Sequence, residues 1–212
     1  MAADIYAESF MSWWASADDR DRKLYEDVLG YEDKYFKDMT LRADSILRDF
    51  LYLEVADENG IFQPAALDGP MMASSIANWY YRFKVVDLPK GTQGRISIED
   101  RVIEISPECC ESPSVIMHEM IHAYEHALEE VAPFFRDILL FCLHKDLSEK
   151  IKDLYSLILR QSHALRAEDV YMEGGSHGVL FFLKSLDIDI RMGLRLGTTF
   201  GYGADSEDAP QA

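Results

Sequence analysis

The stretch that decides the fold begins at Ser112 and reads SPSVIMHEMIHAYEH, ending at His126. Serine followed by proline is a typical helix start, with serine as the N-cap and proline at the first helical position. The apolar residues that follow recur at helical spacing. This stretch therefore predicts a helix over residues 113–130 that ends before Pro133.

Inside this predicted helix, His118, Glu119 and His122 form an HExxH pattern. Positions i and i+4 lie on one face of a helix, one turn apart, so both imidazoles can reach one zinc ion. Glu119 points beside such a metal, where its carboxylate can take a proton from a zinc-activated water molecule. The pattern arises by chance in roughly one chain in a hundred of this composition. It therefore favours a zinc site over two surface histidines on an ordinary amphipathic helix.

A catalytic zinc site usually has three protein ligands and a water molecule, so a further ligand must come from another segment. His177 is the leading candidate. It follows the pair Gly174-Gly175, where the chain can turn sharply, and it precedes Gly178, which permits close backbone approach beside a ligand. The strongly apolar residues 179–183 come next and would dock on the core, which would hold His177 rigidly.

Other residues stay open as the third ligand. Glu168 lies in a predicted helix, from which the gluzincin class of zinc peptidases donates a carboxylate, and Glu173 lies close after it. His126 extends the pattern to HExxHxxxH, but in a continuous helix it lies about 12 Å along the axis from His118. No glycine breaks the helix between His122 and His126. We therefore rank these three residues below His177.

Outside this stretch, the pattern predicts helices around a small sheet. Residues 95–98 and 101–105 alternate apolar and polar side chains on either side of Glu99-Asp100, which is typical of an antiparallel hairpin. We expect the strand at 101–105 to hold an extended substrate by edge pairing. Further helices are expected from the start to Gly30, then at 34–55, 133–144, 148–163, 164–172 and 178–192. This order predicts an α+β fold.

The segment IEISPECCESPSVIMHEMIHAYEH, residues 103–126, resembles the centre of the SprT-like zinc metallopeptidases, the group that includes Spartan. That family pairs a similar strand end with a helix beginning HEMIHA or HELIHA, and its third ligand is a histidine followed by glycine and an aromatic residue. The stretch SHGVLF, residues 176–181, is similar to that element. The resemblance implies a zincin-like fold with zinc at His118, His122 and His177 and with Glu119 as general base.

The length of 212 residues, 48% of them hydrophobic, fits one domain with an extension. Turn-forming residues from Asn59-Gly60 to Pro70 predict a boundary there. We therefore expect a helical N-terminal extension over residues 1–60, a zincin-like metallopeptidase domain over 61–203 and an acidic tail over 204–212.

The chain is strongly acidic, with 21 Lys and Arg against 38 Asp and Glu and a net charge of −17. Such a chain is repelled by phosphate backbones and by anionic membrane surfaces, so neither nucleic acid nor membrane is an expected partner. The first residues do not resemble a signal peptide, and Cys109, Cys110 and Cys142 form no disulfide framework. We expect reduced thiols and a cytoplasmic location.

These observations predict a soluble zinc metallopeptidase, a hydrolase that cleaves a protein or peptide substrate with zinc as cofactor and Glu119 as general base. The main alternative is a non-catalytic zincin-like module, in which the metal stabilises a regulatory or interaction surface. A weaker alternative is a non-peptidase hydrolase that uses the same zinc site. The oligomeric state stays open.

Overall fold

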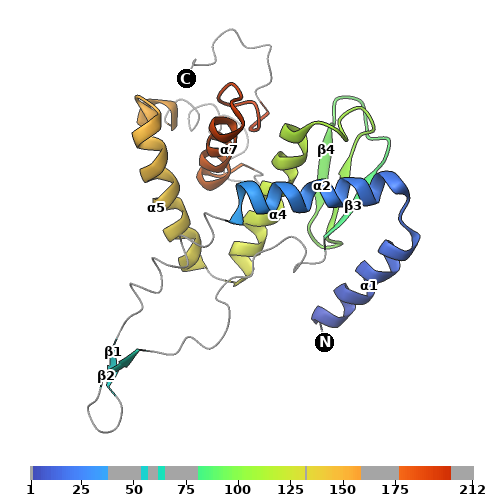
Figure 1. The fold of residues 1–212 in the computed structure, drawn as a ribbon, viewed down its shortest axis with the longest axis horizontal. Helices are drawn as coiled ribbons and strands as arrows, with labels where there is room; N and C mark the ends of the chain where they lie inside the picture. Colours follow the sequence, from blue (N-terminus) through green and yellow to red (C-terminus); the bar gives the residue numbers. More distant parts are fainter. Residues whose placement is uncertain are drawn as a thin grey trace.

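The computed structural model describes residues 2–37, 54–56, 62–64, 81–131, 133–158 and 177–201, which form an α+β fold (Figure 1). The predicted boundary at residue 60, the helix predicted at 164–172 and the acidic tail at 204–212 lie outside these residues. The elements are α1 (Ala2–Ser16), α2 (Asp19–Tyr35), β1 (Glu54–Ala56), β2 (Phe62–Pro64), β3 (Arg82–Val85), β4 (Gly94–Ser97), β5 (Val102–Ile105), α4 (Pro113–Val131), α5 (Pro133–Lys150) and α7 (Val179–Met192).

The central sheet has three strands in the order β3-β5-β4. The predicted hairpin is confirmed, because β4 and β5 pair antiparallel with Gly94 opposite Ile105. The expectation that the strand at 101–105 is an edge strand is wrong, because β5 also pairs in parallel with β3. Among the described strands, β4 and β3 are the edges of this sheet. The strands β1 and β2 form a separate antiparallel pair.

The helix α4 begins at Pro113, as predicted, and the carbonyl of Ser112 accepts the first helical hydrogen bond from the Ile116 N–H at 3.1 Å. One side of α4 packs against one face of the sheet, because apolar residues alternate along β3 and β5 and recur at helical spacing along α4. The helix contacts β4 and β5, and fully buried residues of the sheet and of α4 belong to one hydrophobic core: Phe83, Ile103, Ile105, Ile116, Met117, Met120 and Ile121.

The helices after α4 differ in part from the prediction. α5 continues to Lys150 and takes in the start of the helix that was predicted at 148–163. The chain breaks from helix at Asp153, which has a left-handed φ of 67°. α7 matches its predicted range and ends at Gly193, whose φ of 68° is typical of a glycine that terminates a helix. α5 and α7 pack on each other and on α4.

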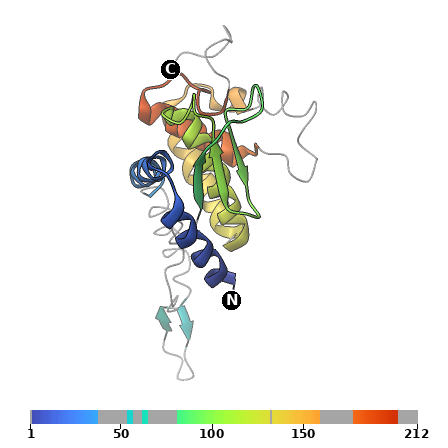
Figure 2. The ribbon, with the colours of Figure 1, turned by 90° about the vertical axis from the view of Figure 1, so that its right-hand side faces the viewer.

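The N-terminal helices join the same hydrophobic core rather than standing apart from it. The carboxylate of Asp18 caps α2 by accepting the N–H groups of Arg20 and Asp21, each at 2.9 Å. α2 passes through Gly30, where the sequence predicted an end, and packs on β3 (Figure 2). Residues 54–56 form β1, so the helix predicted at 34–55 does not reach residue 55, and residues 38–53 lie outside the described residues.

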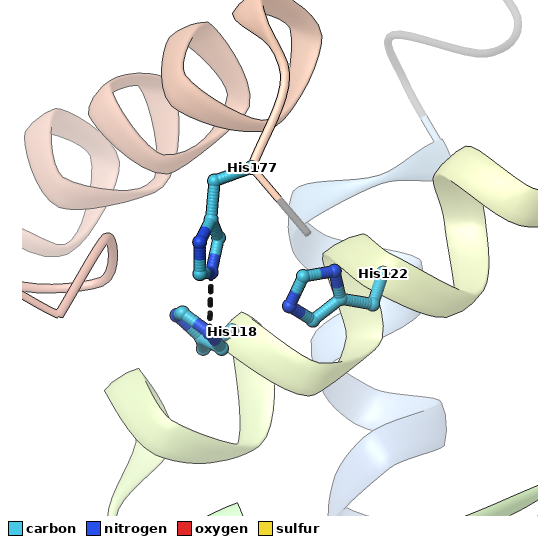
Figure 3. A group of neighbouring side chains, drawn as sticks. All are labelled: His118, His122 and His177. Atoms are coloured by element: carbon cyan, nitrogen blue, oxygen red, sulfur yellow. Dashed lines mark hydrogen bonds between the residues drawn. The ribbon is translucent and has the colours of Figure 1, made fainter. Parts of the chain in front are cut away.

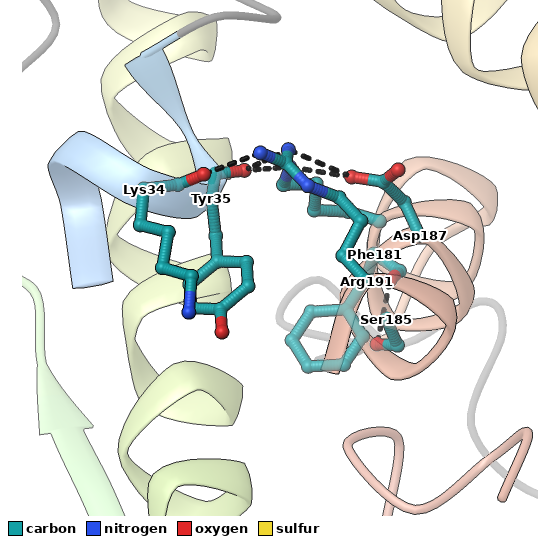
Figure 4. A network of polar contacts seen from close by, with 7 residues as sticks. Lys34, Tyr35, Phe181, Ser185, Asp187 and Arg191 are labelled. Carbon is teal, nitrogen blue, oxygen red and sulfur yellow. Dashed lines mark hydrogen bonds and ion pairs between the residues drawn. The ribbon is translucent and has the colours of Figure 1, made fainter. Parts of the chain in front are cut away.

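The C-terminal end of α2 is bonded to α7 (Figure 4). Buried Lys184 donates to the carbonyl of Tyr35 at 2.5 Å and to the carboxylate of Asp187 at 3.0 Å. Arg191 donates to the carbonyls of Lys34 and Tyr35. The last carbonyls of a helix have no partner within it, so these two cations satisfy the end of α2.

Two further expectations concern the state of the cysteines and membrane-spanning helices. Cys109, Cys110 and Cys142 are free thiols, as predicted. In the described ranges, no helix combines the length and the apolar character that crossing a bilayer requires.

Candidate metal centre

Three histidines converge beside α4 (Figure 3). His118 and His122 come from successive turns of α4, and His177 lies just before α7. The ring centroids are 5.1 Å apart for His118 and His122, and 5.0 Å apart for each of these rings and His177. One nitrogen from each residue lies within 4.8 Å of the other two. The structure therefore brings together the three residues that the sequence proposed as ligands.

Of the other candidates for the third ligand, His126 alone lies among the described residues, and it is not part of this group. His126 lies one turn beyond His122 on α4, and the close group consists of His118, His122 and His177 among the residues that could be searched. Glu168 and Glu173 lie outside the described residues. Within the described part of the chain, His177 is thus the residue that completes the set.

The distance between His118 and His177 fits two ligands of one tetrahedral metal ion. The Nε2 atoms of His118 and His177 lie 3.2 Å apart. Two nitrogens at the usual zinc distance in a tetrahedral site lie about 3.3 Å apart. The Nδ1 atom of His118 lies 2.8 Å from the carbonyl oxygen of Thr199. Because a carbonyl only accepts hydrogen bonds, this contact places the proton on Nδ1 and leaves the Nε2 lone pair for a metal.

One aromatic ring, that of Phe181, lies against all three imidazoles. The ring centroid of Phe181 lies 4.8 Å from that of His118, 4.5 Å from that of His122 and 4.6 Å from that of His177. Burial in this apolar setting lowers the pKa of His118, and burial together with the neighbouring imidazoles lowers the pKa of His122 to about 3. Both rings are therefore neutral near pH 7, as metal ligation requires.

Glu119 lies between α4 and the edge strand β4, with only 6% of its surface exposed. A β-carbon added at Gly94 would lie 2.6 Å from Oε1 of Glu119, so β4 approaches this carboxyl group as closely as a glycine allows. Burial raises the pKa of Glu119 to about 7. A carboxyl group with such a pKa can both accept and donate a proton near neutral pH.

Sequence reasoning missed two contacts that hold the site together. The carbonyl of Thr199 orients His118, and any residue type could supply a carbonyl, so no sequence signal exists for it. The carboxylate of Glu125 on α4 accepts the N–H of Phe181 at 3.0 Å. The N-cap of α7 is Gly178, which has no side chain to cap the helix, so Glu125 supplies this bond from a neighbouring helix. It thereby ties α7, and with it His177, to α4.

The arrangement combines three nitrogen donors with a buried carboxyl group on the same helix as two of them. Imidazole nitrogens suit zinc, and a tetrahedral zinc ion with three protein ligands keeps a fourth position open. Comparison of the chain with protein-family models, with curated proteins and with solved structures gives no match in any of the three.

Proposed function

We propose that this chain is a zinc-dependent metallopeptidase with a zincin-like fold, in which His118, His122 and His177 hold the metal and Glu119 is the general base. The observation that carries the proposal is the convergence of three imidazoles from two distant segments at the helix that also carries a buried carboxyl group. Helix α4 lies against the sheet beside the edge strand β4, and the proposed peptidase function requires such an arrangement.

Zinc, when bound, supplies a Lewis acid that lowers the pKa of water and polarises a scissile carbonyl group. Glu119 accepts the proton of the attacking water at its carboxylate and passes it to the leaving amine. In the metal-free chain, burial raises the pKa of Glu119 to about 7, which places its proton exchange near neutral pH. His118, His122 and the base Glu119 share α4, so the proton acceptor keeps a fixed position relative to these two ligands.

The edge strand β4 is the element that we propose for substrate binding. Among the described strands, β4 pairs on one side only, with β5, so its other edge can pair with an extended peptide. At Gly94 the strand lies directly beside the Glu119 side chain of α4. A peptide added to β4 would therefore run past the general base. We propose a protein or peptide as the substrate and the cytoplasm as the location.

The proposal is tested by replacing Glu119 with glutamine, which has the same shape but accepts no proton. Zinc content and the cleavage of an unfolded protein and of a fluorogenic peptide mixture are measured for the wild-type chain and for Glu119→Gln. We expect one zinc per chain in both proteins and cleavage by the wild type alone. Equal cleavage by both proteins contradicts the mechanism. Zinc binding without cleavage by the wild type favours the non-catalytic module instead.

A further inference from the structure

The chain after α7 returns to the metal centre through residues 194–201. Gly197 and Gly201 have left-handed φ angles of 91° and 104°, so this segment is an irregular turn without a repeating hydrogen-bond pattern. Such a segment needs side-chain contacts to adopt a single conformation. Its contacts therefore decide how firmly it can hold a neighbouring group.

Asp189 on α7 provides these contacts. Its side chain is fully buried. Oδ1 accepts the N–H of Thr199 at 3.0 Å and the hydroxyl of Thr199 at 2.6 Å, and Oδ2 accepts the N–H of Gly197 at 2.7 Å. A buried carboxylate is costly unless donors surround it, and here three donors from one short segment do so. The segment is thus bonded to α7 at Gly197 and at Thr199.

The same segment contacts two of the three histidines. The Thr199 carbonyl accepts the Nδ1–H of His118 at 2.8 Å. The next residue, Phe200, packs its ring 5.2 Å from the ring of His177. A neutral histidine has two tautomers, and the hydrogen bond at one nitrogen decides which of them is present. The position of the Thr199 carbonyl therefore decides whether Nε2 of His118 faces the other imidazoles with a free lone pair.

We propose that Asp189 is a positioning residue of the metal centre, which fixes the Thr199 carbonyl and thereby sets both the tautomer and the ring orientation of His118. The chain of contacts runs from the Asp189 carboxylate through the backbone of Thr199 to the Nδ1–H of His118. This inference rests on the proposed metal site for its effect on zinc. The tautomer of His118 is set in the metal-free protein as well.

The first arm of the test measures zinc affinity by competition with a chromophoric chelator. In Asp189→Asn, an amide nitrogen that cannot accept a hydrogen bond replaces one carboxylate oxygen, and we expect zinc affinity to fall by about 10- to 100-fold. Thr199→Val removes the hydroxyl donor and should weaken zinc binding, whereas Thr199→Ser keeps it and should restore binding toward the wild-type value. An affinity within about twofold of wild type for Asp189→Asn would overturn the inference.

Asp187→Asn is the matched control. Asp187 is also buried on α7, but it bonds to Lys184 and Arg191 instead of the 194–201 segment. A loss that came from a less stable α7 would appear in both variants. We expect Asp187→Asn to lower the free energy of unfolding while its folded form binds zinc as the wild type does. Equal losses of affinity in both variants would also overturn the inference.

The second arm reads the tautomer of His118 from its nitrogen chemical shifts in the metal-free protein. We expect a single tautomer protonated on Nδ1 in the wild type and a mixture in Asp189→Asn. The same single tautomer in both proteins would overturn the inference. This arm needs no metal. A wild type that takes up no zinc would refute the proposed metal site, but the tautomer measurement would still show whether Asp189 positions His118.

Discussion

The Nε2 atoms of His118 and His177 lie 3.2 Å apart, although 59 positions separate the two residues in the chain. α4 and α7 create this contact by packing against each other, and the bond from the Phe181 N–H to Glu125 holds the start of α7 at α4. The ring of Phe181, on α7, packs against all three histidines. The site therefore depends on the junction of two helices.

Glu125→Ala should loosen this junction. The N–H of Phe181 loses its acceptor at a helix start whose N-cap, Gly178, has no side chain, so we expect a loss of about 1 kcal/mol in the free energy of unfolding. Zinc affinity should fall too, because His177 directly precedes this N-cap. Glu125→Gln keeps an acceptor oxygen and should lose less of both. Urea unfolding and chelator competition measure the two effects, and a Glu125→Ala protein that matches the wild type in both contradicts the capping role.

Gly94→Ala should disturb Glu119 without removing a ligand. The new methyl group would lie 2.6 Å from Oε1 of Glu119, so the carboxyl group or the strand must move. We expect peptide cleavage to fall by at least about tenfold, since a displacement of 1 Å at a catalytic group can cost about a hundredfold, while zinc content stays unchanged. Gly30→Ala is the control, because its methyl group would meet open space on α2. Full activity of Gly94→Ala would show that β4 does not constrain the base.

Glu119 also makes stability depend on pH. Burial raises its pKa from 4.5 to about 7, so the folded metal-free protein binds this proton more tightly than the unfolded chain. The contribution to stability is complete below pH 4.5 and is lost as the pH rises through 7. Glu119→Gln has no such charge to bury. Relative to wild type, its free energy of unfolding should therefore rise by up to about 3 kcal/mol between pH 4.5 and pH 8.

Guanidinium unfolding of both metal-free proteins at the two pH values measures this change. His118 and His122 have lowered pKa values and so destabilise the folded state as the pH falls below about 6.5, but they are present in both proteins and cancel in the difference. A stability difference between wild type and Glu119→Gln that is the same at both pH values contradicts the burial of an ionisable Glu119.

Lys184→Met should destabilise the junction between α2 and α7. Lys184 is 1% exposed, and its removal leaves Asp187 and the Tyr35 carbonyl without this donor in a buried setting, which typically costs about 3–5 kcal/mol. Lys23→Met is the control. Its ion pair with Asp27 is solvent-exposed, so its loss should change the free energy of unfolding far less than the loss of Lys184 does. Similar losses in both variants, measured by urea unfolding, would contradict the importance of the buried pair.

Local patterns in the sequence predicted the parts of this fold that local interactions determine. The start of α4 at Pro113, the facing pair His118 and His122 and the range of α7 follow from capping and helical spacing, and the structure confirms these elements. His177 was proposed from the glycines around it, and the structure places it beside the other two histidines.

Contacts between distant segments could not be predicted in the same way. The strand β5 is central because β3 pairs with it in parallel, and alternation along one strand says nothing about its second neighbour. The Thr199 carbonyl and the Glu125 cap act through the backbone and across helices, so neither residue type carries a signal for its function. The end of α5 was misplaced because the break is a left-handed Asp153 and no glycine or proline marks it.

The most direct test of the three-histidine site is the zinc content per chain of the wild type and of His177→Ala, measured by mass spectrometry after dialysis against a weak chelator. We predict one zinc per wild-type chain and a strong reduction or complete loss in His177→Ala, because two histidines on α4 alone cannot hold the ion against the chelator. One zinc per chain in both proteins would assign the third ligand to another residue. No zinc in the wild type would contradict the metal centre itself.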